Sequence, residues 1–434
     1  MKLCTMGLGY IGLPTSVMFA KHGVDVVGVD IYSEIVSKLN AGELHIEEPG
    51  LGDVLREAVE NKKFRASLTP EAADVFLIAV PTPNKQDQYK SCDLSYVIQA
   101  SEKIIPLVEK GNVIIVESTI SPRSMDDGVR PLFEKAGFTI GEDIYLVHCP
   151  ERVLPGRIMH ELIHNDRIVG GVTEACADAG ARVYETFVKG DIIRTDAKTA
   201  EMSKLMENTF RDVNIALANE LSKICLKLDI NVLNVISMAN KHPRVNIHQP
   251  GPGVGGHCLA VDPYFIVAKA PELAKMIKTA RDTNVSMPHY VVDNVKMLLE
   301  GVRKPKVAVF GLTYKGNVDD LRESPAVEVV NLLMSEGNIE VALHDPHVAL
   351  NKMPVVPAEE AVNQADLILV LTDHNEFKEM DLDSLTKSMK HKLLLDTRNC
   401  INQERYEQVN VINMGNLYQY KSNQVASFKS SRAI

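Results

Sequence analysis

The first thirty residues carry the pattern that most restricts the fold of this chain. A short apolar stretch over residues 3–6 runs into the loop 7–12, which reads Gly-Leu-Gly-Tyr-Ile-Gly. A helical stretch follows through Ala20, and a second apolar run over residues 24–29 ends at Asp30. Glycines in this order of strand, turn, helix, strand and acidic residue are the signature of a dinucleotide-binding unit. We therefore expect the chain to begin with a Rossmann-like domain.

Each glycine of this loop has its own expected task. Gly7 permits the tight turn, Gly9 lets a pyrophosphate approach the backbone, and Gly12 allows the helix to pack closely on the strand. The free N–H groups at the helix N-terminus would face the phosphates. Asp30 would bond the adenosine ribose and repel a 2′-phosphate. NAD is therefore the expected cofactor.

The alternation of strand and helix continues beyond this unit. Unalternated apolar runs at residues 74–80, 112–116 and 144–147 predict a parallel sheet that is buried on both faces. Ligands of such sheets bind beyond the carboxyl ends of the strands. The candidates in the loops that leave these strands are Thr82, Cys92, Thr119, Cys149 and Glu151. The alternative for each is an ordinary turn or capping residue.

A long helix is expected over residues 199–228, which contain neither glycine nor proline and place apolar residues at helical spacing. Such a helix suits the spine between two domains. Lys204, Asn208 and Arg211 fall on one face of it. A lysine and an asparagine side by side can both donate to a developing oxyanion, although a solvated polar face is the commoner reason for this spacing.

The stretch from Gly251 to Pro263 crowds four glycines before Cys258 and places Asp262 after it. A cysteine beside such a loop can act as a nucleophile, since its thiolate attacks carbonyl carbon readily. The alternative is a glycine-rich turn with an inert cysteine. The seven cysteines form no framework or CxxC pair, which favours reduced thiols in a cytoplasm and argues against a metal site.

The last third of the chain looks like a weak repeat of the first. After a charged linker at 301–305, apolar runs at 307–311, 341–344, 365–370 and 393–397 resemble those of the first half. The triple-glycine fingerprint is absent from this half.

Two cations stand near the first turn of this second half. Lys315 and Arg322 can hold the phosphates of a different nucleotide. Surface ion pairing with Asp319, Asp320 and Glu323 is the alternative.

These patterns predict an α/β chain with two Rossmann-like parallel-sheet domains joined by a central helical region. The expected domains are 1–198 for the cofactor, 199–300 for the helices and the Cys258 loop, and 301–434 for a second nucleotide. The net charge of −10 argues against nucleic acid. No apolar run is long enough to span a bilayer. The chain begins without a recognisable signal peptide, and the polar tail at 422–434 is expected to fray.

The combination of these parts indicates a reaction class. Oxidation of an alcohol by NAD needs no cysteine. A nucleophilic Cys258 would capture the aldehyde as a thiohemiacetal, a second hydride would leave to give a thioester, and water would release a carboxylate. A cofactor half, a nucleotide half and a cysteine between them predict a nucleotide-sugar dehydrogenase. A catalytically silent NAD or UDP sensor is the alternative, but a sensor has no use for this set of side chains.

Five motifs resemble the UDP-glucose/GDP-mannose dehydrogenase family, and together they cover nearly the whole chain. They are Gly-Leu-Gly-Tyr-Ile-Gly-Leu-Pro at 7–14, Pro-Glu-Arg-Val-Leu-Pro-Gly at 150–156, Thr-Ala-Glu-Met-Ser-Lys-Leu-Met-Glu-Asn at 199–208, Gly-Val-Gly-Gly-His-Cys at 253–258 and Tyr-Lys-Gly…Arg-Glu-Ser-Pro-Ala at 314–326. The segments 242–251 and 165–167 look most like the UDP-N-acetyl-D-mannosamine 6-dehydrogenase branch. Enzymes of that branch make an aminosugar uronate for bacterial polysaccharides, including capsules. Activity on UDP-N-acetylglucosamine, UDP-glucose or GDP-mannose is the alternative.

The resemblance implies roles for named residues. Cys258 is the nucleophile, Lys204 and Asn208 stabilise the oxyanion, and Thr119, Asp262 and Glu151 position or activate water. The cofactor-binding set is Gly7, Gly9, Tyr10, Ile11, Gly12, Asp30, Thr82 and Thr119. The substrate-binding set is Glu151, Lys204, Asn208, Arg244, Asn246, Gly251, Gly255, Lys315 and Arg322.

The resemblance also implies a homodimer through the central helices, with Arg244 reaching across the interface. One position departs from the family, because its UDP-glucose dehydrogenases carry a second glutamate where this chain has Pro155. The identity of the base is therefore open. For His257 we expect a structural role. Cys92 is the main candidate to form a regulatory disulfide with Cys258, and Cys149 is the alternative, since all three are expected at the cleft side of the sheet.

Overall fold

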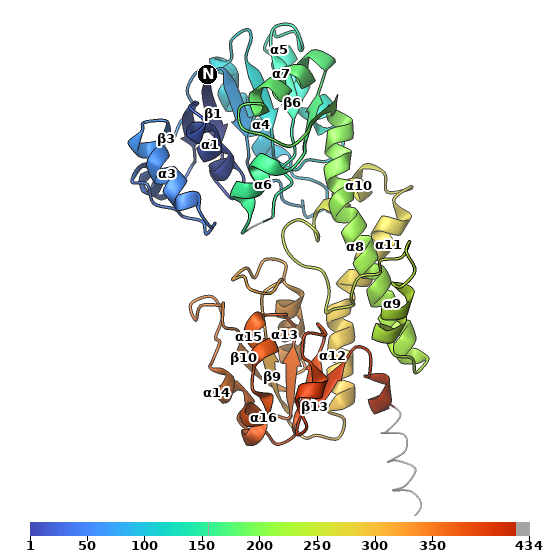
Figure 1. Ribbon diagram of the computed structural model, residues 1–434. Coiled ribbons are helices and arrows are strands. Elements are labelled where there is room, and N and C mark those ends of the chain that lie inside the picture. The colour runs from blue at the N-terminus through green and yellow to red at the C-terminus, as the bar shows by residue number, and fades with distance from the viewer. Residues whose placement is uncertain (155, 422–434) are drawn as a thin grey trace, which may run out of the picture. The chain divides into compact units, whose positions relative to one another are not determined.

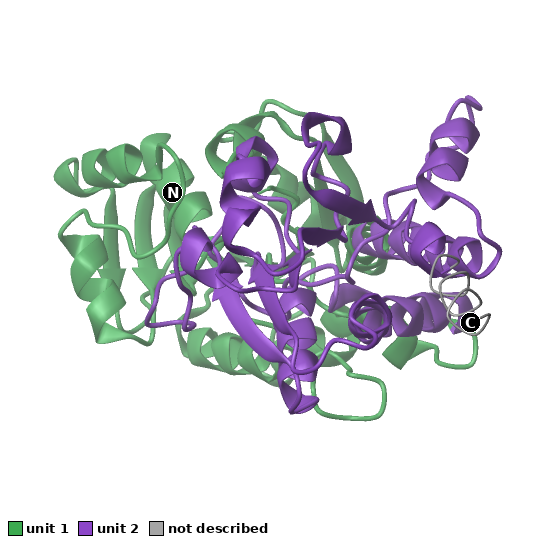
Figure 2. Ribbon diagram, turned by 90° about the horizontal axis from the view of Figure 1, so that it is seen from below, with its two compact units in different colours: residues 1–207, 264–274 green, residues 208–263, 275–434 purple. Residues whose placement is uncertain are grey.

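The computed structural model describes residues 1–154 and 156–421. Contacts divide the chain into two compact units, each an α/β assembly around its own sheet (Figures 1 and 2). Unit 1 comprises residues 1–207 and 264–274, and unit 2 comprises residues 208–263 and 275–434. Pro155 and the tail at 422–434, both subjects of sequence-based expectations, lie outside the described residues.

Unit 1 is built on an eight-stranded sheet with the order β3-β2-β1-β4-β5-β6-β7-β8. The strands are β1 (Lys2–Met6), β2 (Asp25–Val29), β3 (Phe64–Ser67), β4 (Val75–Ile78), β5 (Val113–Val116), β6 (Tyr145–His148), β7 (Arg167–Gly171) and β8 (Ile192–Asp196). The predicted runs at 74–80 and 112–116 become β4 and β5, and every residue of these strands is buried. The run at 144–147 falls in β6, and β4, β5 and β6 are parallel to one another, as predicted. Strand β7, which was not predicted, runs antiparallel to β6.

Helices flank this sheet. They are α1 (Gly12–Lys21), α2 (Ser33–Asn40), α3 (Leu51–Glu60), α4 (Ser95–Ile104), α5 (Arg130–Lys135), α6 (Ile158–His164) and α7 (Glu174–Tyr184), with the shorter turns η1 (Ile105–Leu107) and η2 (Met125–Val129). Helix α1 is buried from Gly12 to Ala20, as expected for the helix that follows a dinucleotide loop. Thr173 starts α7 by accepting the Cys176 N–H with its side chain, a typical N-cap.

Unit 2 contains a five-stranded parallel sheet with the order β10-β9-β11-β12-β13. The strands are β9 (Lys306–Phe310), β10 (Glu340–His344), β11 (Leu367–Val370), β12 (Leu393–Asp396) and β13 (Asn410–Asn413). The helices with it are α9 (Val232–Ala239), α11 (Lys275–Val285), α12 (Met287–Leu298), α13 (Pro325–Ser335), α14 (Ala358–Val362), α15 (Asn375–Glu379) and α16 (Leu382–Leu385), with η3 (Thr386–Ser388) and η4 (Gln403–Arg405).

Two helices belong to both units. The predicted long helix is confirmed as α8 (Ala197–Lys227), which passes from unit 1 into unit 2 after Glu207. Helix α10 (Asp262–Lys269) starts in unit 2 and continues in unit 1 from Tyr264. The three-part division into 1–198, 199–300 and 301–434 stays a prediction, since the two units share the central segment.

The internal repeat predicted from sequence extends to individual hydrogen bonds. The glycines that end β1 and β9, Gly7 and Gly311, both have positive φ angles, 96° and 90°. Each donates its N–H to the last carbonyl of the neighbouring strand, at 2.8 and 2.9 Å. The N–H of the next residue is accepted by the acid after that strand, Asp30 at 3.2 Å and Asp345 at 2.7 Å. The two halves therefore share one turn geometry.

Within residues 1–154 and 156–421, no helix has both the length and the apolar character needed to cross a bilayer.

We predict that Gly12→Ala destabilises unit 1. A Cβ at this position would lie 2.0 Å from the Gly7 carbonyl oxygen. Overpacking of this kind should lower the free energy of unfolding by about 2 kcal/mol or more, measured by urea titration. The matched control is Gly52→Ala in α3, where the nearest atom lies 3.4 Å away. It should raise stability by up to about 1 kcal/mol. Equal effects of the two changes would contradict this explanation.

Candidate active site

The loop at the start of α1 offers a cradle for a pyrophosphate. A Cβ on Gly7 would lie 2.5 Å from the Ala79 carbonyl oxygen, and one on Gly12 would lie 2.0 Å from that of Gly7. These two glycines are therefore required by the fold of the loop itself. A Cβ on Gly9 would meet no atom within 4 Å. Gly9 thus leaves open space beside the α1 N-terminus, which fits the close approach of a phosphate.

Other members of the expected cofactor set lie around this cradle. Asp30 follows β2, and its carboxylate accepts the N–H groups of Leu8 at 3.2 Å and Tyr32 at 3.1 Å. Tyr10 is 40% exposed and Ile11 is half-buried, just before α1. The arrangement fits the dinucleotide fingerprint, with an acid held beside the glycine loop.

The loops that leave β4 and β5 are joined by a hydrogen bond. The Thr82 hydroxyl donates to the Thr119 carbonyl oxygen at 2.6 Å. Both threonines were predicted from the sequence as residues at the carboxyl ends of the parallel strands. The structure brings them together at that edge of the sheet, where ligands of such sheets bind.

The glycine-rich loop before Cys258 packs tightly on the segment that leads into α13. A Cβ on Gly255 would lie 2.4 Å from the Glu323 carbonyl oxygen, and one on Gly256 would lie 2.8 Å from the Tyr314 ring. Gly256 also has a φ of 84°. These glycines are therefore needed for close packing of the chain on itself. Gly251 and Gly255 stay predicted substrate residues.

Cys258 lies in the turn that starts α10. Its carbonyl oxygen accepts the N–H groups of Val261 at 3.0 Å and Asp262 at 2.8 Å, and the residue is half-buried. The Asp262 carboxylate accepts a hydrogen bond from Asn208 Nδ2 at 2.6 Å, and both residues are buried. All three residues are candidates from the sequence, and the hydrogen bond links their two segments directly.

The other polar residues of the α8 face differ in exposure. Lys204 is half-buried one turn before Asn208, and Arg211 is exposed one turn after it. Lys204, Asn208 and Arg211 therefore lie at helical spacing on α8, as predicted. Its buried member, Asn208, is the one whose side chain is fixed by a hydrogen bond.

Glu151 is held by partners that sequence analysis did not identify. One of its oxygens accepts the Arg152 N–H at 2.7 Å, and the other accepts Arg167 Nη2 at 3.0 Å. The same guanidinium lies 3.5 Å from Glu117, which also accepts the Tyr184 hydroxyl at 2.6 Å. The sequence does show Glu117 and Glu151 as polar residues just after predicted strands. It does not show that β7 runs antiparallel to β6, and this direction places Arg167 beside the two carboxylates.

Burial controls the ionisation of this cluster. Removal from water raises the pKa of Glu117 to about 7, although the Arg167 charge opposes the shift. Burial also raises the pKa of the Cys149 thiol to about 12. Cys149 is thus an unreactive thiol at neutral pH. Cys92 is buried as well, in a loop that forms a β-bridge to Asn84.

The cations expected to hold the second nucleotide are found at the surface of unit 2. Arg322 forms an ion pair with Asp320, with nitrogen–oxygen distances of 2.7–3.1 Å. Lys315 is exposed. Arg244 and Asn246 are exposed on the loop after α9, which Asn240 fixes through bonds to the backbone of residue 247 at 2.7 and 2.9 Å. Ligand binding by these four residues stays a prediction.

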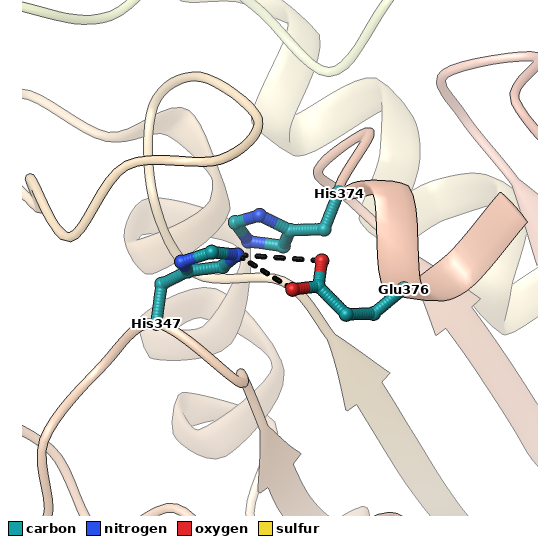
Figure 3. A group of neighbouring side chains, drawn as sticks. All are labelled: His347, His374 and Glu376. Atoms are coloured by element: carbon teal, nitrogen blue, oxygen red, sulfur yellow. Dashed lines mark hydrogen bonds and ion pairs between the residues drawn. The ribbon is translucent and has the colours of Figure 1, made fainter. Parts of the chain in front are cut away.

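One side-chain cluster of unit 2, His347, His374 and Glu376, places its potential metal-ligand atoms within 4.8 Å of one another (Figure 3). His347 Nε2 lies 3.1 and 3.3 Å from the two oxygens of Glu376. The neighbouring His374 uses Nδ1 to accept the Asn317 N–H at 2.9 Å, and its Nε2 lies 3.2 Å from Asp345. Because both nitrogens of His374 are engaged, we assign this cluster to a hydrogen-bond network that holds the loop after β9.

The chain matches three models of one family in sequence order. The NAD binding domain of the UDP-glucose/GDP-mannose dehydrogenase family matches residues 1–188, its central domain matches residues 198–286, and its UDP binding domain matches residues 308–403.

Individual relatives extend over nearly the whole chain. The UDP-N-acetyl-D-mannosamine dehydrogenase of Methanococcus maripaludis is 48% identical over 407 residues, which are 92% of this chain and 93% of that protein. An enzyme of Ralstonia nicotianae named NDP-N-acetyl-D-galactosaminuronic acid dehydrogenase is also 48% identical, over 91% of this chain and 95% of its own.

Solved structures give the same result. A derivative structure of the UDP-N-acetyl-mannosamine dehydrogenase Cap5O from S. aureus is 62% identical, with a TM-score of 0.91 and coverage of 97% of this chain and 100% of the other. The dehydrogenase of the same name from Pyrococcus horikoshii is 42% identical, with a TM-score of 0.89, over 96% of this chain and 100% of the other. The chain belongs to the UDP-glucose/GDP-mannose dehydrogenase family and is an NAD-dependent nucleotide-sugar dehydrogenase.

Proposed function

We propose that this enzyme oxidises the C6 hydroxyl of UDP-N-acetyl-D-mannosamine to the uronate, with Cys258 as the covalent nucleophile. The observation that carries the residue assignment is the buried Asn208–Asp262 hydrogen bond beside the Cys258 turn. It joins two chemically suited side chains that lie 54 residues apart in the sequence, and the Asp262 N–H also donates to the Cys258 carbonyl oxygen at 2.8 Å. The sugar assignment is supported by the names of the relatives.

The residues of unit 1 fit the cofactor. The Gly7–Gly12 loop and the α1 N-terminus would hold the pyrophosphate, Asp30 would bind the adenosine ribose, and Thr82 and Thr119 would lie at the edge where the nicotinamide enters. A bound NAD would supply the hydride acceptor for both oxidations of the sugar carbon.

Cys258 and the polar residues of α8 would act in the capture of the aldehyde and the formation of the thioester. The alcohol first loses a hydride and a proton to become an aldehyde. The Cys258 sulfur then bonds to the aldehyde carbon, and the oxygen that becomes negative accepts hydrogen bonds from Lys204 and Asn208. Loss of a second hydride converts the thiohemiacetal to a thioester.

Hydrolysis completes the reaction. Water attacks the thioester carbon, the carbon–sulfur bond breaks, and the thiol of Cys258 is regenerated with release of the carboxylate. We assign the positioning of this water to Glu151, Asp262 and Thr119. Because Pro155 replaces the second glutamate found in UDP-glucose dehydrogenases, Glu151 is the carboxylate of its loop proposed for this task.

The substrate itself has a second candidate. Relatives named for N-acetyl-D-mannosamine and for N-acetyl-D-galactosaminuronic acid are both 48% identical to this chain. Both names specify an N-acetylated amino sugar, which supports this class over UDP-glucose and GDP-mannose. We favour the mannosamine derivative because the 62% identical structure carries that name. The UDP-sugar would be held by the predicted residues Arg244, Asn246, Gly251, Gly255, Lys315 and Arg322.

We also propose that the enzyme acts as a homodimer through α8. Five large apolar side chains of this helix are exposed, Met202, Met206, Phe210, Leu217 and Ile224, and so is Leu228 directly after its last residue. Their spacings of four and seven residues place them on one face of the helix. A second copy would bury this stripe, and Arg244 of each copy would then reach the partner's site.

Two further expectations belong to this proposal. A cytoplasmic location is supported by the scattered cysteines, which suit a reducing compartment. A regulatory disulfide between Cys92 and Cys258 also stays a prediction, since the burial of Cys92 requires its loop to open first.

A panel of nucleotide sugars tests the substrate proposal directly. UDP-N-acetylmannosamine should give the highest kcat/KM, at least about 100-fold above UDP-glucose and GDP-mannose, because buried groups that bind the acetamido group would be left unpaired by those sugars. NADH absorbance is the readout. A preference for UDP-N-acetylgalactosamine would favour the second candidate. Binding without turnover across the panel would favour a sensor.

Replacement of the nucleophile tests the mechanism. The wild type should form about two NADH per sugar. Cys258→Ser should reduce acid formation by about 1000-fold or more, because the hydroxyl is a weaker nucleophile. Cys400→Ser is a matched control, a half-buried thiol of unit 2 outside the loop, and should leave the yield unchanged. A yield of about one NADH with free aldehyde would contradict the thioester route.

Charge placed on the apolar stripe tests the dimer. Leu217→Glu should weaken self-association by at least about 100-fold, measured by sedimentation equilibrium, because each dimer would bury two unpaired carboxylates. Leu350→Glu changes another exposed leucine of unit 2 and should have no effect. If Leu217→Glu left the association constant of the wild type unchanged, α8 would not form the interface.

A further inference from the structure

Two buried carboxylates share one guanidinium at the carboxyl edge of the unit 1 sheet. Arg167 bonds Glu151 at 3.0 Å and lies 3.5 Å from Glu117. The side chains are 5%, 6% and 0% exposed, in the order Arg167, Glu151 and Glu117. With all three groups charged, the cluster would hold a net negative charge away from water, which is costly.

The direction of β7 explains why Arg167 lies there. Strands β6 and β7 are antiparallel, and His148 pairs with Gly170. Continued for three residues, the same register places Glu151 opposite Arg167. An antiparallel strand enters the sheet at the edge where its parallel neighbours end. The first residue of β7 is thereby delivered to the edge where ligands bind.

The remaining contacts fix the guanidinium in place. Its Cζ lies 4.5 Å from the centre of the Tyr184 ring, and Nη1 lies 3.7 Å from Cys149 Sγ. The Tyr184 hydroxyl donates to Glu117 at 2.6 Å. These contacts leave Arg167 little freedom other than a shift between the two carboxylates.

Burial shifts the pKa values of several groups around this guanidinium. Burial raises the pKa of Glu117 to about 7. Burial raises the pKa of Tyr184 well above its usual value and that of Cys149 to about 12. His148 stays neutral, because burial lowers its pKa to about 4. A protonated Glu117 carries no charge, so it no longer competes with Glu151 for the guanidinium that lies 3.0 Å from Glu151 and 3.5 Å from Glu117.

We propose that Arg167 and Glu117 are positioning residues for Glu151, and that protonation of Glu117 decides how firmly the shared guanidinium holds Glu151. When Glu117 ionises, it competes for Arg167 and draws it away from Glu151. The inference rests on the proposed role of Glu151 at the water of thioester hydrolysis. Its effect therefore falls on kcat, through hydrolysis, more than on the KM for NAD.

The test compares Glu117→Gln with the wild type across pH. Glutamine keeps the oxygen that accepts the Tyr184 hydroxyl but cannot ionise. The ratio of variant to wild-type kcat should rise by about threefold or more between about pH 6 and about pH 8, with its midpoint at the Glu117 pKa. A constant ratio would overturn the proposal, because a merely structural role reduces activity equally at each pH.

Arg167→Lys supplies the coupling test. A single amine cannot serve both carboxylates in the way a guanidinium fork does, so this variant should lose about tenfold or more in kcat near pH 8. Glu117→Gln in the same chain should restore part of the loss. Arg194→Lys is the control, because Arg194 pairs with Asp178 and Glu185 at the surface of unit 1. If the kcat of the double variant equalled the product of the two single effects, the two carboxylates would not be coupled through Arg167, and the proposal would be contradicted.

A stability measurement tests the network without any substrate. The folded pKa of Glu117 is raised above its unfolded value, so the folded state binds the proton more tightly. This contribution to stability is fully present below the unfolded pKa and is lost as pH rises through about 7. The Tm of Glu117→Gln minus that of the wild type should therefore increase from about pH 4.5 to about pH 7 and then level off. A flat difference would contradict the inference, whereas lack of turnover by the wild type would contradict only the proposed function.

Discussion

The hydrogen bond between Asn208 and Asp262 holds the loop of Cys258 to the long helix of the chain. Its two ends are buried and lie 2.6 Å apart, so loss of the Asp262 carboxylate removes the acceptor of the buried Asn208 amide at a cost of about 1–3 kcal/mol. The N–H of Asp262 also holds the Cys258 carbonyl at 2.8 Å. The position of the thiol is thereby tied to α8, which also carries Lys204 and the apolar stripe proposed as the dimer interface.

The two units use one turn for two different purposes. Gly-Leu-Gly-Tyr-Ile-Gly at 7–12 and Gly-Leu-Thr-Tyr-Lys-Gly at 311–316 follow equivalent strands. In unit 1, Gly9 leaves open space for a phosphate. In unit 2 the matching residue is Thr313, buried, with its hydroxyl bonded to the backbone at 2.8 Å. Asp345, the counterpart of Asp30, contacts His374 at 3.2 Å. The second turn therefore cannot bind a dinucleotide in the manner of the first.

Local patterns in the sequence were sufficient to predict much of the fold and part of the site. The glycine loop, α8 and the buried strands follow from residue spacing and backbone preference, which act over a few neighbours. Asn208 and Asp262 were each identified as candidate site residues, although the hydrogen bond between them was not predicted.

The features that sequence analysis missed depend on contacts between distant segments. The short strand β7 has no distinctive spacing, so its antiparallel direction and the arrival of Arg167 beside Glu117 and Glu151 were not predictable. The packing of Gly255 against the Glu323 backbone likewise depends on where unit 2 places its own chain. In both cases the decisive partner is remote in sequence.

The central claim is that the sugar carbon becomes covalently bound to Cys258. The most direct measurement is mass spectrometry of peptides from acid-quenched turnover, with Glu151→Gln used to slow hydrolysis. The account predicts that a peptide containing Cys258 gains the mass of the acyl nucleotide sugar, and that the adduct requires both NAD and substrate. Two results would contradict this claim. One is an unmodified Cys258 peptide in Glu151→Gln although the wild type turns over, and the other is an adduct on a different cysteine.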